Sequence, residues 1–489
     1  MLAIPIFLPL ISGMFIFFLA TVGRKWQEGL TRRLSILVMT LVMITALVHF
    51  GNLFWGSSDL TIWYLKKDIP VYFSIDPMGG IFSTLVVFVW ILVTLYTFSY
   101  MEEDKKAARF LGCHLMTLGT LMGITSAGNL VTMYLFYEGM TLVTIGYVVH
   151  AQTKEAIAAG YKYLFYSIIG AFLGLVGFFY IYQFGTSLAF VPGGVLEAGK
   201  IAGHETLLRV VILGMIIGFG SKAGMFPLHG WLSTAHPVAP APASAILSGV
   251  NTKMGVLAII RVIYYIAGPE FIRGSFVQYV GIFLTLLTVF MGSMLAYKER
   301  IMKRRLAYST VSQVSYILFG VLLLHPLGLV GAMLHVIYHS VIKNNLFLCA
   351  GAVIHQTGST HVAEYRGIGK RMPVTMICFT MASLALVGIP PFSGFVSKWE
   401  LCMGALASGI GFAKIAGPVI LLISALLTAG YLLTVSVHAF YDKPVQDKFC
   451  EADYKMLLPM IILAILALGL GIFAEPVLSF MTNVVSQVL

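Results

Sequence analysis

The segment from residue 373 to 409 reads PVTMICFTMASLALVGIPPFSGFVSKWELCMGALASG. It is apolar and longer than the roughly 20 helical residues that cross a bilayer, but Gly388, Pro390 and Pro391 interrupt it, and Lys398 follows. Such an interruption frees backbone carbonyls, and unwound backbone persists within a membrane only beside protein or water. The segment therefore predicts two half-helices inside a helical membrane protein.

The composition of the whole chain agrees with this interpretation. Of the 489 residues, 59% are hydrophobic and only 10% are charged, whereas soluble domains carry about 25% charged residues. The first apolar run begins at Met1 without a basic region or a cleavage site, which indicates a retained helix rather than a signal peptide. We expect an all-α integral membrane protein with about fourteen transmembrane helices. The expected helices are 2–22, 33–54, 78–100, 111–128, 130–150, 160–184, 207–233, 243–267, 276–297, 305–324, 328–355, 373–409, 415–440 and 456–486.

The basic residues of the loops predict the orientation. When the loops are numbered by the helix they follow, 19 basic residues lie in the odd loops and 6 in the even loops. Cytoplasmic loops are enriched in Lys and Arg, so the odd loops should be cytoplasmic. Both termini should then lie on the outer side of the cell (cytoplasmic) membrane. The odd loops contain Arg24, Lys25, Arg32, Arg33, Lys105, Lys106, Arg109, Lys154, Lys298, Arg300, Lys303, Arg304, Arg305, Arg366, Lys370, Arg371, Lys443, Lys448 and Lys455. The even loops contain Lys66, Lys67, Lys200, Arg209, Arg273 and Lys414.

The same charge bias explains the net charge of +11 without a nucleic-acid partner. The five cysteines are scattered and form no CxxC pair, so we expect neither an iron–sulfur cluster nor a metal site in this chain.

A second proline-interrupted segment lies at 207–233. It contains Gly218–Lys222, which reads GFGSK, and the segment 373–409 contains Gly394–Lys398, which reads GFVSK. Paired broken helices in corresponding positions are typical of inverted-repeat transporters.

Charged residues inside the expected helices point to function, because a charge at the bilayer centre costs several kcal/mol. Glu138 lies deep in 130–150, and we expect it to pair with Lys222. A carboxylate near a lysine keeps that lysine charged, so a movable pair would be a switchable proton site; a static ion pair between two helices is the alternative. Lys162 and Arg261 lie near helix ends, where long side chains reach the interface.

A further group follows in the next helices. Lys253 has no acidic residue near it in the sequence, and a buried unpaired lysine exchanges a proton readily. His335, His339 and Lys343 are spaced four residues apart, so they share one helix face. Imidazole relays protons near neutral pH. A metal site at the two histidines is the alternative, but no carboxylate or thiolate lies in register to complete it.

Two histidines flank the first break, His229 near Pro227 and His236 near Pro237, where a proton could enter; ordinary loop residues are the alternative. Because protonatable groups dominate, we expect the transported ion to be H⁺. In chain order the candidate line is Glu138, Lys222, Lys253, His335, His339, Lys343 and Lys398.

The sequence resembles the antiporter-like membrane subunits of respiratory complex I, of membrane-bound hydrogenases and of Mrp-type sodium/proton antiporters. The resemblance covers nearly the whole chain. The similar motifs are Phe73–Pro77 (FSIDP), the helix of Glu138, Lys222–Leu232 (KAGMFPLHGWL), Ala239–Ala245 (APAPASA), Arg305–Ser312 (RLAYSTVS), the helix of His335–Lys343, and Gly388–Lys398.

The resemblance implies two inverted five-helix repeats with discontinuous seventh and twelfth helices. The expected parts are 1–105, 106–270 (first repeat), 271–442 (second repeat) and 443–489. It also implies a coupling pair of Glu138 and Lys222 and a central relay at Lys253. The face His335–Lys343 would continue the relay, and Lys398 would communicate with the far side. The chain departs from the family in lacking the long lateral helix of its largest members and in having Ser248 where many members have histidine.

Three functions remain open. The chain could be a proton-translocating subunit of a redox-driven complex, whose partner subunits would carry iron–sulfur clusters, flavin or a nickel–iron centre. It could instead belong to an Mrp-type antiporter that exchanges Na⁺ for H⁺, or be a membrane scaffold with static charges. Other membrane subunits, the lipid bilayer and, for the first function, a peripheral redox module are the expected partners.

Overall fold

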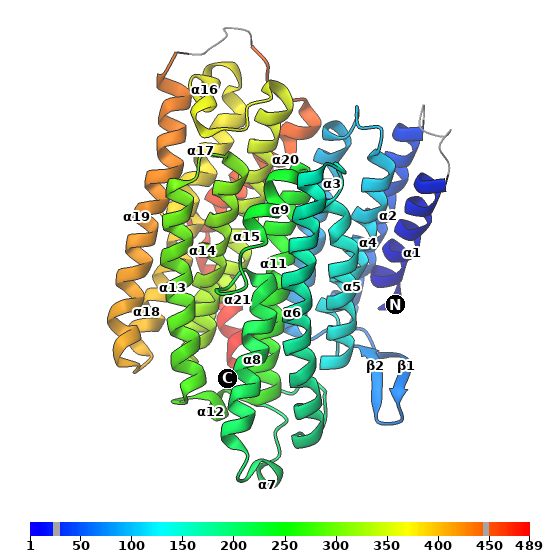
Figure 1. The fold of residues 1–489 in the computed structure, drawn as a ribbon, viewed down its shortest axis with the longest axis vertical. Coiled ribbons are helices and arrows are strands. Elements are labelled where there is room, and N and C mark those ends of the chain that lie inside the picture. Colours follow the sequence, from blue (N-terminus) through cyan, green and yellow to red (C-terminus); the bar gives the residue numbers. More distant parts are fainter. Residues whose placement is uncertain (23–29, 444–448) are drawn as a thin grey trace.

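The protein is a bundle of long helices (Figure 1). A computed structural model describes residues 1–22, 30–443 and 449–489, without the side chains of residues 30–32. The predicted orientation also uses Arg24, Lys25, Lys448 and the side chain of Arg32, which lie outside this description. The helices before the second break are α1 (Ala3–Val22), α2 (Leu30–Trp55), α3 (Pro77–Tyr100), α4 (Ala107–Thr125), α5 (Leu130–Val148), α6 (Lys154–Phe184), α7 (Ala198–Ile201), α8 (Glu205–Ala223), α9 (Leu232–Val238), α10 (Ala241–Ile246), α11 (Thr252–Ile260), α12 (Pro269–Ile272), α13 (Phe276–Lys298), α14 (Met302–Leu322), α15 (Pro326–Thr357) and α16 (Ile368–Arg371). The later helices are α17 (Pro373–Val387), α18 (Ser393–Ala407), α19 (Gly411–Tyr441), α20 (Tyr454–Ile472) and α21 (Ala474–Ser486).

These helices agree with the expected all-α membrane fold. Within the described residues, eleven helices are long and apolar enough to cross a membrane, and one of them is the continuous helix Ala241–Ala267 that contains α10 and α11. The other expected crossings correspond to α5, α14 and the broken pair α17–α18, so the total of fourteen stays a prediction. The expected helix 456–486 is divided into α20 and α21.

The loops gather at two ends of the bundle. Figure 1 shows α7, α12 and a β-hairpin at one end and α16 at the other, with both termini marked in the half nearer the hairpin. This arrangement is compatible with the predicted sidedness, in which the α16 end faces the cytoplasm.

The hairpin was not expected from the sequence. Its strands are β1 (Leu60–Lys66) and β2 (Ile69–Phe73), which pair antiparallel. Lys66 Nζ donates to the hydroxyl of Tyr182 at 2.7 Å, and this hydroxyl donates to Asp68 at 2.7 Å, so the hairpin is held to α6. Aromatic and β-branched residues on either side of a two-residue turn are the signal that could have predicted it.

The two breaks have the same local chemistry. Gly224 ends α8 with φ +82° and Gly388 ends α17 with φ +88°, a left-handed conformation that glycine adopts without steric cost and that often ends helices. Pro227 and Pro391 follow three residues later, and proline cannot continue a helix. The expected half-helices at 373–409 are therefore confirmed as α17 and α18.

The matching pentapeptides do not occupy equivalent places. Gly218–Lys222 lies before its break, at the end of α8, whereas Gly394–Lys398 lies after its break, at the start of α18. The breaks themselves correspond, because Gly224–Gly230 and Gly388–Gly394 share the pattern Gly-x-x-Pro-x-x-Gly. This pattern supports the division into repeats 106–270 and 271–442, which stays a prediction.

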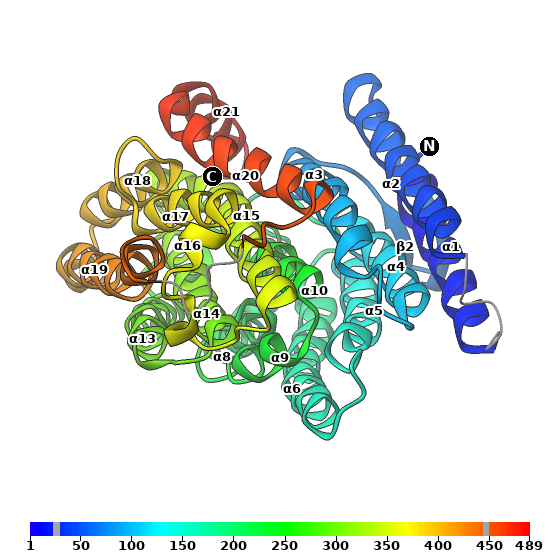
Figure 2. The ribbon, with the colours of Figure 1, turned by 90° about the horizontal axis from the view of Figure 1, so that it is seen from above.

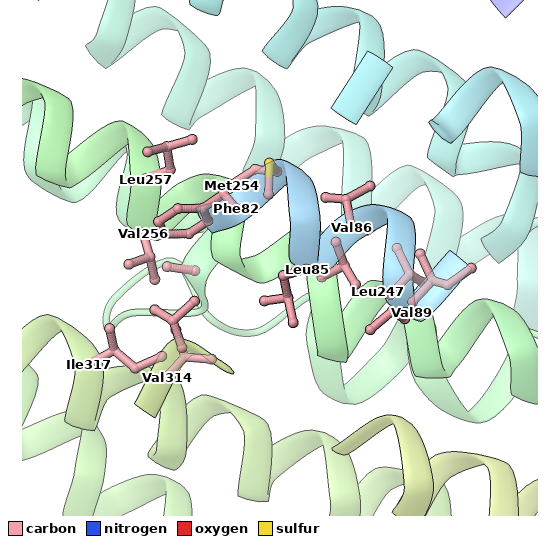
Figure 3. Close-up of a cluster of buried hydrophobic side chains, with 14 of the residues drawn as sticks. Phe82, Leu85, Val86, Val89, Leu247, Met254, Val256, Leu257, Val314 and Ile317 are labelled. Atoms are coloured by element: carbon pink, nitrogen blue, oxygen red, sulfur yellow. The ribbon is translucent and has the colours of Figure 1, made fainter. Parts of the chain in front are cut away.

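Apolar side chains form a core inside the bundle. Figure 3 shows side chains of α3, of the helix Ala241–Ala267 and of α14 in contact, among them Phe82, Met254 and Val314. The helix Ala241–Ala267 is buried along its whole length. Lys253 lies on this helix, so its ammonium group is far from bulk water.

Arg261, which the sequence places near a helix end, is buried in an ion pair. Its side chain is only 2% exposed and forms a two-pronged ion pair with Asp76, in which Nη1 donates to Oδ2 at 2.7 Å and Nη2 donates to Oδ1. The guanidinium also lies over the rings of Phe190 and Tyr265. Asp76 caps α3 and Arg261 belongs to the helix Ala241–Ala267, so the pair joins elements distant in sequence.

The Asp76→Asn variant should be less stable than the wild type by about 3 kcal/mol, because it leaves the buried Arg261 without its partner. Asparagine still caps the helix, so the variant measures the effect of removing the negative charge of Asp76 alone. The measurement is thermal unfolding in detergent.

The same variant should change the pH dependence of stability. Burial raises the pKa of Asp76, but the charge of Arg261 and the hydrogen bonds to this carboxylate outweigh burial and hold the pKa below its ordinary value. A lowered pKa in the folded state gives stability that is present above about pH 4 and is lost as the pH falls through the folded-state value. We expect the wild type to lose this contribution below about pH 4, whereas Asp76→Asn lacks it at every pH. Parallel unfolding curves for both proteins from pH 7 downward would contradict this account.

Candidate functional site

Lys222 is held by hydroxyl groups of α6. It lies in the last turn of α8 and is 3% exposed. Its Nζ donates to the hydroxyl of Tyr163 at 2.6 Å and to Ser167 Oγ at 2.8 Å. Nζ also lies 4.1 Å from the centre of the Tyr163 ring, a favourable cation–π distance. The ammonium group is therefore well satisfied without an acid.

Glu138 does not form the direct ion pair that the sequence suggested. It is half-buried on α5, and its Oε1 is enclosed without a hydrogen-bond partner. Glu138 and Lys222 are not among the ion pairs within 4.0 Å in the described part of the chain. Their charges still act on one another, so the structure shows an open pair with the lysine turned toward α6.

Lys253 and His339 are in direct contact. Both are fully buried, and Lys253 Nζ lies 2.7 Å from His339 Nδ1 and donates to the carbonyl of Ser248 at 2.7 Å. A charged lysine can only donate, so Nδ1 is then the acceptor. A proton can pass from Nζ to Nδ1 along this hydrogen bond. Ser248 thus contributes to the site through its backbone.

His335 extends this contact toward the second break. Its Nδ1 lies 2.8 Å from Ser397 Oγ of α18, and its Nε2 lies 3.2 Å from Gln313 Oε1 of α14. The His335 and His339 rings stack with their centres 5.8 Å apart. His335 therefore lies between the Lys253–His339 contact and α18.

Lys343 is fully buried on the same face of α15. Its Nζ donates to Ser309 Oγ at 2.7 Å and to the carbonyl of Leu306 at 3.1 Å. Like Lys222, it is bound by neutral oxygen atoms.

Lys398 binds the end of the other half-helix. Its Nζ donates to the carbonyls of Leu386 at 2.6 Å and of Val387 at 2.9 Å, the last two residues of α17. Carbonyls at a helix C-terminus lack intrahelical donors and carry the negative end of the helix dipole. The break in the helix thus creates a binding place for a cation, and Lys398, which is only partly buried, occupies it.

The two histidines near the first break are not joined to the line by hydrogen bonds. His229 is half-buried between α8 and α9, and its Nδ1 has no partner. His236 is fully buried, neither ring nitrogen has a partner, and the ring stacks on Phe347 at 4.8 Å. A role for either residue in proton uptake stays a prediction.

The line as a whole runs across the bundle. Its first and last residues belong to α5 and α18, and these helices lie apart in the view from above, with α10 and α15 between them (Figure 2). Contacts join Lys253 to His339 and His335 to α18, but no side-chain hydrogen bond joins Lys222 to Lys253 among the described residues. In the same part of the chain, no group of three or more His, Cys, Asp or Glu side chains is placed to hold a metal ion.

Several contacting residues were missed by the sequence analysis. Tyr163 and Ser167 are four residues apart in an apolar helix, a spacing that places both on one face. This spacing could have identified them as partners of an intramembrane charge. Ser309 and Gln313 have the same spacing, which places both on one face of α14, whereas Ser397 gave no comparable signal.

Glu138→Gln should slow ion translocation about fivefold, because it removes the charge that acts on Lys222 across a gap, an effect on the order of 1 kcal/mol. The measurement is acidification of sealed vesicles per amount of assembled protein. Glu103→Gln, which neutralises an exposed loop carboxylate, is the matched control. Normal coupling in Glu138→Gln would remove the support for this pair.

Comparison with known proteins gives two family matches. Residues 127–428 match the model described as NADH:quinone oxidoreductase/Mrp antiporter, TM. Residues 62–111 match the model of the NADH-Ubiquinone oxidoreductase (complex I), chain 5 N-terminus.

Individual proteins of similar length also match. NADH-quinone oxidoreductase subunit N of Desulforudis audaxviator is 32% identical over 424 residues, which is 83% of this chain and 82% of that protein. A Na(+)/H(+) antiporter subunit of Alkalihalophilus pseudofirmus is 27% identical over 494 residues, which is 99% of this chain and 96% of that protein. A chain of the membrane-bound sulfane sulfur reductase, an archaeal respiratory membrane complex, has a similar fold, with a TM-score of 0.86 at 23% identity over 100% of this chain and 97% of that chain.

Proposed function

Since the chain belongs to the NADH:quinone oxidoreductase/Mrp antiporter family of membrane subunits, we propose that it is a proton-translocating subunit of a multisubunit, redox-driven ion pump of the complex I and membrane-bound hydrogenase type. Its own side chains move protons, and the redox centres belong to partner subunits. We place it in the cell membrane with both termini on the outer side.

The contact between Lys253 and His339 carries this proposal. Both groups are fully buried, and 2.7 Å separates the two nitrogens. Burial of a charge within a membrane is costly, and such residues usually mark an ion path. The transfer converts charged Lys253 and neutral His339 into neutral Lys253 and charged His339, and the reverse step restores the pair.

The neighbouring groups extend the line in both directions. Lys222 and the open Glu138 form one end, and His335 and Lys398 lie on the side of α18. Lys343 lies on α15 one turn beyond His339 and binds α14. Movement of Lys222 between Tyr163 and Glu138 would change its charge state, which is how a signal from a partner subunit could be coupled to the centre of the line.

Gentle purification through a tag on this chain tests the proposal. We expect membrane subunits and a peripheral module containing iron–sulfur clusters, flavin or nickel to co-purify. A complex of membrane subunits without these cofactors would contradict the redox-driven function.

The second candidate is a subunit of an Mrp-type Na⁺/H⁺ antiporter without a redox reaction. The observation in its favour is the match to the Na(+)/H(+) antiporter protein of Alkalihalophilus pseudofirmus, which extends over 99% of this chain and 96% of that protein. Sodium-dependent proton transport by a complex free of redox cofactors would support this function.

A further inference from the structure

A tyrosine and a threonine form a hydroxyl chain at Lys222. Tyr163, which accepts a hydrogen bond from Lys222 Nζ at 2.6 Å, lies 2.6 Å from Thr144 Oγ1 of α5, and either oxygen can be the donor. Thr144 Oγ1 also lies 2.7 Å from the carbonyl of Met140. Lys222, Tyr163 and Thr144 are each no more than 3% exposed, so the chain is shielded from water.

A similar chain is present at Lys343. Ser309, which accepts from Lys343 Nζ at 2.7 Å, also accepts from the hydroxyl of Tyr431 at 2.7 Å. The hydroxyl of Tyr431 lies 3.2 Å from Thr428 Oγ1 of the same helix, α19. Each of the two lysines is thus connected to a buried tyrosine–threonine pair, directly in one case and through one serine in the other.

Hydroxyl groups differ from the carbonyls that bind the other lysines. A carbonyl only accepts hydrogen bonds, so it stabilises a lysine as a donor, whereas a hydroxyl both donates and accepts. When Lys222 is charged, Tyr163 accepts from Nζ and donates to Thr144. When Lys222 is neutral, Nζ has a lone pair, and Tyr163 can donate to it while accepting from Thr144.

We propose that Tyr163 and Tyr431 are positioning residues that satisfy Lys222 and Lys343 in both charge states. Tyr163 reverses its hydrogen bond with Thr144, whereas Tyr431 donates to Ser309 in both states and leaves the Ser309 hydroxyl free to donate to a neutral Lys343. No proton leaves either tyrosine. The proton released by the lysine passes along the line described above, so this inference rests on the proposed function. It explains how these lysines exchange protons with no carboxylate within 4.0 Å in the described structure.

The charged groups that interact with Lys222 and Lys343 must stay unchanged in any variant that tests the hydroxyls. Glu138 is the charged group that acts on Lys222. Lys343 acts on Lys253, His339 and His236. The tyrosine variants leave all of these groups in place.

The test is Tyr163→Phe, which keeps the ring against Lys222 and removes only the hydroxyl. We expect translocation to fall about tenfold, and the pH of half-maximal rate to shift by about one unit, as for loss of one hydrogen bond to a charged group. Tyr264→Phe is the matched control, because this buried hydroxyl donates to the carbonyl of Val321, away from the lysines. An unchanged rate and pH profile in Tyr163→Phe would overturn the proposal.

Thr144→Val and Tyr431→Phe provide the second test if Tyr163→Phe does not assemble. Both leave every direct contact of the lysines in place, and we expect each to shift the pH profile; normal profiles in both would overturn the proposal. The Lys222→Ala variant distinguishes failure of the proposed function from failure of the hydroxyl-chain proposal. Normal transport in Lys222→Ala would contradict the proposed function, whereas loss of transport there with a normal Tyr163→Phe would contradict the hydroxyl chain alone.

Discussion

Lys253→Ala is expected to reduce proton translocation at least about a hundredfold, because a positioned proton-transfer group contributes a factor of about 10² to 10⁴. Lys253 is fully buried in the middle of the line, and its Nζ is the group in contact with His339 Nδ1. Alanine offers no proton, and the Ser248 carbonyl beside this position only accepts hydrogen bonds. The measurement is the acidification rate of sealed membrane vesicles, normalised to the amount of assembled complex.

Assembly of Lys253→Ala should be near normal. No carboxylate lies within 4.0 Å of Lys253 in the described structure, so removal of its ammonium group leaves no buried charge without a partner. Lys414→Ala, at an exposed position in the first turn of α19, is the matched control and should translocate normally. Collapse of assembly in Lys253→Ala alone would show that this residue is structural.

Lys222→Ala is expected to cause a comparably severe loss of translocation. It removes the charged group on which Glu138 acts. Without Lys222, a change at Glu138 can no longer alter the charge state of a group near the centre of the line. The hydroxyls of Tyr163 and Ser167 lose a donor, but Tyr163 keeps its contact with Thr144 and Ser167 keeps its bond to the Tyr163 carbonyl, so assembly should survive. Lys200→Ala removes an exposed lysine paired with Glu197 and is the control. Transport in Lys222→Ala at the wild-type rate would favour a scaffold with static charges.

The broken helices could be predicted from the sequence because their cause is local. Glycine and proline within 373–409 determine where the helix ends, and the spacing of His335, His339 and Lys343 determines their shared face. These features depend on residues within a few turns of one another. The GFGSK and GFVSK match pointed to the two broken helices, but a short repeat does not specify on which side of each break it lies.

Contacts between distant segments could not be predicted. Asp76 and Arg261 are separated by 185 positions, and only their meeting in the fold shows that the arginine is buried in an ion pair. The partner of Lys222 could not be predicted either. Whether this lysine binds Glu138 or Tyr163 depends on distances between α5, α6 and α8. The partners of Lys398 are backbone carbonyls, which no side-chain pattern reveals.

Proton flux through the complex tests the central claim most directly. The comparison is between vesicles that contain the wild-type complex and vesicles that contain equal amounts of the Lys222→Ala, Lys253→Ala double variant. We predict that the wild type acidifies or alkalinises the vesicle interior in a way that a protonophore abolishes, and that the double variant does not exceed the background. Equal flux in both preparations would contradict a proton path through these buried lysines.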